Sequence, residues 1–169
     1  KKSATIKEKW FPLKINVARS DNSTSTMILF NENMTPGLDI TYDAGFFGGD
    51  SDLKTYTRLV EDNGINFGIQ CLPTQAFDDY IVPLGIETQK GGSITITIED
   101  EDLPSGLSIV LEDKEKDVLL NMRTQQFAYS VGLDENTIAS DRFFIHLSNS
   151  SSLSDNSISV NENSPGISV

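Results

Sequence analysis

The sequence predicts an all-β fold, in the form of an antiparallel two-sheet β-sandwich of jelly-roll type with about nine strands and little helix. Three observations lead to this class. Most apolar runs alternate with polar residues at a period of two, which places one face of a strand on a core and the other in water. Turn residues separate these runs at intervals of roughly ten residues. Apolar residues at helical spacing are almost absent.

The first half of the chain contains five predicted strands. In the first of them, every second residue is a large apolar one. The third and fourth flank Asn63 and Gly64, and an Asn-Gly pair supplies the positive φ angles of a type I′ turn. We therefore expect these two strands to pair as an antiparallel hairpin. In chain order the five strands are residues 13–17, 25–30, 55–60, 65–72 and 80–87.

The second half of the chain contains four predicted strands, separated by segments rich in glycine, proline or serine. In all but the second, a large apolar residue occupies every second position along the core-facing side. Residues 1–9 and 114–122 are the two candidates for a helical turn, and neither has an apolar stripe. In chain order the four strands are residues 94–98, 107–112, 127–131 and 141–148.

The domain organisation follows from length and composition. A chain of 169 residues is one domain, or one domain with a tail. We expect residues 1–9 to be a lead-in and residues 10–148 to form the β-sandwich. The Ser/Asn-rich composition of residues 149–157 is typical of a linker. A further segment, residues 158–169, begins with a new short apolar run.

The charge balance constrains the class of partner. The formal net charge is −12, from 25 acidic and 13 basic residues. This excess disfavours nucleic acids, whose phosphates are bound by neutralising Lys and Arg side chains. It also disfavours anionic membrane surfaces, and no apolar stretch approaches the roughly 20 residues of a membrane span. We expect no nucleic-acid partner and no membrane insertion.

The sequence contains no recognisable reaction motif. Cys71 is the single cysteine, so it has no partner for an intramolecular disulfide, and its apolar surroundings predict a buried thiol. His146 is the only histidine and is distant from Cys71 along the chain. Paired carboxylates occur, as in glycosidases, but nothing in the sequence sets their separation. We therefore predict that the chain is not an enzyme and has no catalytic residues.

Residues 39–52 are the best candidate for a cation site. This segment is glycine-rich and acidic, and it contains Asp39, Asp43, Asp50 and Asp52. Loop carboxylates that converge with backbone carbonyls are the ligands that Ca²⁺ requires. The spacing does not match an EF-hand loop, and the alternative is a solvated loop whose aspartates cap turns. We retain the four aspartates as a candidate calcium site, with calcium as the only candidate cofactor.

Trp10, Tyr42, Phe46 and Phe47 form a candidate ligand platform. Exposed aromatic rings on a sandwich stack on sugar rings in carbohydrate-binding modules, whereas buried rings are core. The sequence leaves these two alternatives open for all four residues.

Seven segments resemble, in their order, one known family. They are residues 34–44 (MTPGLDITYDA), 67–73 (FGIQCLP), 82–86 (VPLGI), 92–96 (GSITI), 110–114 (VLEDK), 126–129 (QFAY) and 141–147 (DRFFIHL). Through them, residues 10–148 are similar to the β-sandwich module that precedes the C-terminal sorting domain of cargo proteins of the Bacteroidota type IX secretion system.

The resemblance implies a secreted or cell-surface location and a non-catalytic role, as a structural or interaction module next to the sorting signal. Residues 158–169 would then begin the sorting domain. The implied partners are the rest of the parent polypeptide and the secretion machinery, with a glycan or a cell-surface protein as a further candidate. The acidic motif at Asp39 and Asp43 matches that of the family, as local structure or a cation site. A carbohydrate-binding module, with or without calcium, is the alternative function.

Overall fold

The computed structural model describes residues 9–59, 64–123 and 128–149. Within these ranges it contains eleven strands and one short 3-10 helix, so the all-β prediction is confirmed. In chain order the elements are β1 (Phe11–Arg19), β2 (Asn22–Phe30), β3 (Ala44–Gly45), β4 (Leu53–Arg58), β5 (Asn66–Leu72), η1 (Thr74–Phe77), β6 (Asp79–Thr88), β7 (Gly92–Glu99), β8 (Leu107–Asp113), β9 (Val118–Asn121), β10 (Tyr129–Leu133) and β11 (Thr137–Asn149).

Each of the nine predicted strands overlaps one observed strand. The predicted hairpin is confirmed, because β4 and β5 pair antiparallel and Gly64 has a φ of 79°. Two strands, β3 and β9, were not predicted, since two and four residues are too few to show an alternation. The structure places β9 where residues 114–122 were a candidate helical turn, so that expectation was wrong.

Several predicted segments lie wholly or partly outside the described residues. Residues 1–8 of the lead-in, Phe127 of the eighth predicted strand and residues 150–169 belong to this group. Most of the predicted linker and all of the predicted start of a sorting domain fall within the last of these. The domain boundaries therefore stay predictions.

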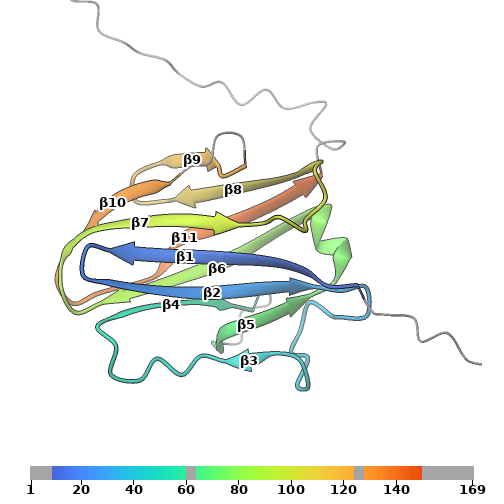
Figure 1. The fold of residues 1–169 in the computed structure, drawn as a ribbon, viewed down its shortest axis with the longest axis horizontal. Coiled ribbons are helices and arrows are strands. Elements are labelled where there is room, and N and C mark those ends of the chain that lie inside the picture. The colour runs from blue at the N-terminus through green and yellow to red at the C-terminus, as the bar shows by residue number, and fades with distance from the viewer. Residues whose placement is uncertain (1–8, 60–63, 124–127, 150–169) are drawn as a thin grey trace, which may run out of the picture.

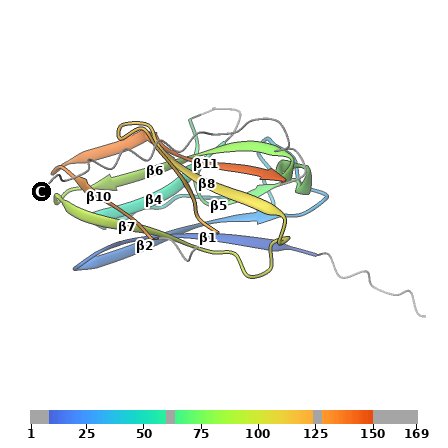
Figure 2. The same ribbon diagram turned by 90° about the horizontal axis from the view of Figure 1, so that it is seen from above.

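The described strands form one hydrogen-bonded sheet rather than two separate ones. Their order is β10-β7-β1-β2-β5-β4-β6-β11-β8-β9, with β3 added against β5. Neighbours pair antiparallel except β2 and β5, which run parallel. The sheet curls so that β1, β2 and β7 face β6, β8 and β11, as Figures 1 and 2 show. The result is a nearly closed, flattened barrel of eleven strands, in place of the expected two sheets and about nine strands.

The two facing halves of the curled sheet stay connected, because backbone hydrogen bonds continue through the bend between β5 and β4. There β4 and β5 share only two residue pairs, Thr57 with Phe67 and Arg58 with Asn66. The predicted alternation correctly identifies the core between the halves, and burying each large side chain there stabilises the fold by roughly 1.5–3 kcal/mol. Core residues from three of the alternating strands are Leu13, Ile15, Val17, Ile94, Ile96, Phe143, Ile145 and Leu147.

Asp113 links strands from both ends of the sheet order. It is fully buried on β8, where its carboxylate accepts hydrogen bonds from Nε and a terminal nitrogen of Arg142, each at 2.8 Å. The Tyr129 hydroxyl of β10 donates a third, also at 2.8 Å. Arg142 sits in an irregular part of β11, where the register against β6 shifts between Ala139 and Phe143. Such bulges re-aim side chains, and this one positions Arg142 to neutralise a buried carboxylate.

Among the described residues, no helix has the length and apolar character needed to cross a membrane.

Candidate binding surface

The connection between β2 and β4, residues 31–52, contains every predicted site residue except Trp10. Its only strand is the two-residue β3, on the lower edge of the molecule in Figure 1. Loops of this length inside a compact domain are uncommon and are frequently functional. We call residues 31–52 the long connection.

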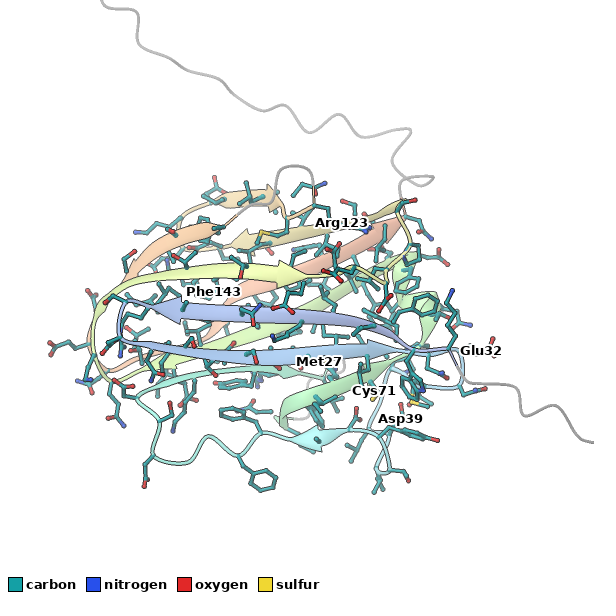
Figure 3. The ribbon with its side chains drawn as sticks, viewed as in Figure 1. Met27, Glu32, Asp39, Cys71, Arg123 and Phe143 are labelled. Carbon is teal, nitrogen blue, oxygen red and sulfur yellow. The ribbon has the colours of Figure 1, made fainter. Side chains whose placement is uncertain are left out.

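Asp39 and Asp43 are brought together in a tight turn of the long connection. The Asp39 carboxylate accepts hydrogen bonds from the backbone N–H of Thr35 at 2.8 Å and from its hydroxyl at 3.1 Å. The Asp43 carboxylate accepts from the backbone N–H of Asp39 at 2.7 Å and from that of Cys71 at 2.6 Å. Figure 3 shows Asp39 and Cys71 at the same end of the molecule. Both aspartates cap the turn, and Asp43 also ties it to β5.

This arrangement disfavours ionisation of the Asp43 carboxyl and of the Cys71 thiol. Burial raises the pKa of Asp43 above its usual value, although the backbone N–H groups of Cys71 and Asp39 oppose the shift. Burial, followed by the nearby carboxylates, raises the pKa of the Cys71 thiol to about 12. Cys71 is therefore a protonated, buried thiol, as the sequence predicts.

Asp52 ends the long connection in a separate cluster of charges. Its carboxylate lies 2.7 Å from a terminal nitrogen of Arg19 and 3.0 Å from Nζ of Lys90. The Asn22 side-chain amide donates a further hydrogen bond at 2.6 Å. Hydrogen bonds from these three groups hold the pKa of Asp52 well below its usual range. Asp50 lies in an exposed turn just before it.

Of the four candidate calcium ligands, the structure thus brings Asp39 and Asp43 together, whereas Asp52 forms ion pairs with basic side chains. Within the described residues, no group of three or more His, Cys, Asp and Glu side chains has a geometry that could hold a metal ion. The calcium site stays a prediction, and Asp39 and Asp43 are the two carboxylates on which it now depends.

The four candidate aromatic residues occupy three different places. The rings of Trp10 and Tyr42 lie against each other, with centroids 5.6 Å apart at an interplanar angle of 40°. Phe46 instead packs on Tyr56 of β4, with centroids 5.2 Å apart. Phe47 projects into solvent and is 94% exposed. The first pair and Phe47 are accessible to a ligand, whereas Phe46 covers the fold.

The long connection also exposes aliphatic side chains that the sequence analysis missed. Ile40 is 84% exposed, and Leu38 and Tyr42 are about half exposed. Single exposed apolar residues are common, but these three and Phe47 all belong to one connection. In the sequence, Leu38, Ile40 and Tyr42 occupy alternate positions, and this pattern could have indicated an apolar surface on the long connection. We call Leu38, Ile40, Tyr42 and Phe47 the apolar loop.

Comparisons with known proteins identify a family. A search of curated proteins and a search of solved structures each found no match. One family model matches residues 2–147, a range that includes the apolar loop and every strand up to Leu147 of β11. The chain therefore belongs to the family described as Domain of unknown function (DUF8693).

Proposed function

We propose that the chain is a non-catalytic structural and interaction module of a larger secreted or cell-surface protein. In this proposal, the apolar loop packs against the domain that precedes the module in the polypeptide. One observation favours this surface above others: Tyr42 of the apolar loop contacts Trp10, at the point where the chain enters the described fold.

The entry point is held against the long connection by two contacts. The Asn31 side-chain amide donates a hydrogen bond to the Lys9 carbonyl at 3.0 Å. The Trp10 ring lies on Tyr42 of the apolar loop, and β1 begins at the next residue. The first described residues therefore lie against Asn31 and Tyr42 of the long connection, and in this proposal the preceding domain covers the apolar loop from that side. Interfaces between domains of one chain bury about 600–1,500 Å², which such a loop can help to supply.

The magnitude of the expected effect follows from the exposed area. Ile40 and Phe47 are almost fully exposed, and burying each side chain is worth roughly 1.5–3 kcal/mol. Covering both would stabilise the contact between the domains by roughly 3–6 kcal/mol before ordering costs. The chain as a whole has a formal net charge of −12, which favours solvation and self-repulsion.

The test compares the 169-residue chain with the longer native polypeptide. The variant is Ile40→Ser with Phe47→Ser, and the matched control is Ile81→Ser with Leu119→Ser, two exposed residues of β6 and β9. We expect neither pair to change the melting temperature of the 169-residue chain by more than a few degrees. In the longer polypeptide, only the first pair should lower the melting temperature and increase the radius of gyration in solution scattering.

Two outcomes would contradict this proposal. One is a longer polypeptide in which both variant pairs behave alike. The other is a native polypeptide with no domain before this one. Separately, turnover of any substrate by the 169-residue chain above a heat-denatured control would overturn the non-catalytic role.

The proposed location and architecture rest on the family resemblance. The two facing halves of the curled sheet support a sandwich-type module of the jelly-roll kind.

We expect a tagged full-length protein to reach the cell surface or medium of a cell with an active type IX system and to be retained when that system is deleted. Equal amounts outside both cells would argue against this route.

A carbohydrate-binding role is the second candidate, favoured by the half-exposed ring of Tyr42 on Trp10. Trp10 is the only tryptophan, so its fluorescence reports directly on this pair. A glycan that stacks there should change the emission, and Tyr42→Ala should abolish the change. If calcium takes part through Asp39 and Asp43, chelation should lower the melting temperature, because a ligand of the native state stabilises it. Unchanged emission and melting curves would remove this candidate.

A further inference from the structure

A hollow with both polar and apolar lining lies at the end of the molecule opposite Asp39, where β4 and β11 begin and β6 ends (Figure 1). Its volume is about 210 Å³. Binding sites for drug-sized ligands enclose about 300–1,000 Å³, so this hollow suits a smaller molecule. It is lined by Ser51, Asp52, Lys54, Glu87, Thr88, Gln89, Asn136, Thr137 and Ile138.

Three adjacent strands supply the floor of the hollow. Lys54 of β4 and Ile138 of β11 are both register partners of Glu87 on β6. Directly paired residues point to the same face of a sheet, so the three side chains lie in a row on the outer face. The Tyr56 hydroxyl donates a hydrogen bond to Glu87 at 3.0 Å and holds this carboxylate in place.

The rim of the hollow is braced by backbone hydrogen bonds between segments distant in sequence. The N–H of Gln89 donates to the carbonyl of Asp52 at 2.9 Å, and the N–H of Asn136 donates to the carbonyl of Gln89 at 3.2 Å. Behind the rim, Arg19 bonds to Thr88 at 2.8 Å as well as to Asp52. The hollow is therefore formed before any ligand arrives, which lowers the ordering cost of binding.

The hollow offers hydrogen-bonding groups of every kind. Glu87 accepts, Lys54 donates, and the side-chain amides of Gln89 and Asn136 do both. No hydrogen bond or ion pair joins the side chains of Lys54, Gln89 and Asn136 to the rest of the described chain. Ile138, 71% exposed, adds an apolar wall. Carboxylates beside an ammonium group disfavour a strongly charged ligand of either sign and favour a neutral one with many hydroxyls.

We propose that this hollow binds a single sugar ring. The ring hydroxyls would bond to Glu87, Lys54, Gln89 and Asn136, and a C–H face of the ring would contact Ile138. The proposal concerns a site separate from the Trp10 and Tyr42 pair, and it does not depend on the apolar loop.

The experiment uses the ¹⁵N-labelled 169-residue chain and five separate probes: D-glucose, D-galactose, D-mannose, L-fucose and N-acetyl-D-glucosamine. Each sugar is titrated to high millimolar concentration while amide chemical shifts are recorded. We expect at least one sugar to bind and to move the amide signals of residues 51–54, 87–89 and 136–138. The titration of that sugar supplies its Kd.

Three variants test the assignment. Glu87→Gln and Asn136→Gly should each raise the Kd at least about 5-fold, the equivalent of one lost hydrogen bond. Glycine suits residue 136 because its φ is 57°. Glu112→Gln, which alters a carboxylate bonded to His146 outside the hollow, should leave the Kd unchanged. Should Glu87→Gln unfold the chain through loss of the Tyr56 bond, Asn136→Gly and Lys54→Met decide the question.

Several results would overturn the proposal. They are an absence of shifts with all five sugars, a Kd unaffected by the hollow variants, or equal weakening by Glu112→Gln. Shifts confined to Trp10 and Tyr42 would also overturn it and would favour the aromatic alternative. The domain-packing proposal has its own test, which uses variants of Ile40 and Phe47.

Discussion

Asp113 shows how a single residue can determine how a sheet closes. Its carboxylate is fully buried, is neutralised by Arg142 through two hydrogen bonds, and accepts a third from the Tyr129 hydroxyl. Arg142 continues to Glu115 at 2.7 Å, which connects the buried pair to solvent. Burial would raise the pKa of Asp113, but the hydrogen bonds from Arg142 and Tyr129 outweigh it and hold this pKa below its usual value.

We predict that Asp113→Asn lowers the free energy of unfolding by about 3–5 kcal/mol, because it leaves the Arg142 charge without its buried partner. Urea denaturation measures the change. Asp117→Asn is the matched control, since Asp117 is exposed and its φ of 53° is one that asparagine tolerates. A loss of similar size in the control would contradict the assignment.

The same carboxylate predicts how stability depends on pH. A depressed native pKa means that the unfolded chain binds the proton more readily, so the contribution of Asp113 is complete above about pH 4. It is lost as the pH falls through the lower native pKa. We expect the melting temperature to drop more steeply below pH 4 in the unmodified chain than in Asp113→Asn. Parallel curves for the two proteins would rule out this linkage.

At the scale of single elements, the pairing of β4 with β6 depends on a glycine. Tyr56 of β4 lies directly over Gly85 of β6, where a Cβ atom would overlap its ring. The ring is almost fully buried, and burial together with Glu87 raises the pKa of its hydroxyl to about 12. The absence of a side chain at position 85 therefore creates the space that Tyr56 occupies.

We predict that Gly85→Ala destabilises the fold by about 1–3 kcal/mol, because the added methyl group displaces Tyr56 from its site. Gly132→Ala in β10 is the matched control, since its Cβ would meet no atom within 4 Å. Thermal denaturation of the two variants measures the difference. Equal melting temperatures would show that Tyr56 relaxes at no cost.

Strands were predicted well where alternation was long and poorly where it was short. Leu13, Ile15 and Val17 give a complete period-two pattern, and they are buried in β1. By contrast, β3 consists of Ala44 and Gly45 alone and exists because β5 offers a free edge beside it. An element that depends on its neighbour leaves little trace in its own sequence.

At the scale of the whole molecule, the strands at the two ends of the sheet order are joined through side chains. β10 and β8 lie near opposite ends of this order, and the Tyr129 hydroxyl reaches Asp113 between them. This contact bridges the two ends of the curled sheet.

We predict that Tyr129→Phe loosens this closure at a cost of about 0.5–1.5 kcal/mol, the usual net value of one hydrogen bond. Native-state hydrogen exchange should become faster for the amides of β10, while those of β6 and β11 stay protected. Tyr42→Phe, at an exposed site, should change neither. Faster exchange throughout the molecule would mean that Tyr129 stabilises the core in general.

The sequence by itself determined that the fold is all-β, the approximate positions of nine strands and the inward face of the alternating ones. These properties are local, because a period of two is visible in five or six consecutive residues. It also indicated that the segment around Asp39 and Tyr42 was unusual. It did not distinguish an aspartate that caps a turn, such as Asp43, from one that forms ion pairs with basic side chains, such as Asp52.

Only the tertiary structure decided the partners of Asp43 and Asp52 and the closure of the sheet. Asp52 meets Arg19 and Lys90 because separate turns converge at one end of the barrel. The strand order and the parallel pairing of β2 with β5 are likewise long-range choices. They depend on how distant segments pack together, and alternation within one strand contains no information about its neighbour.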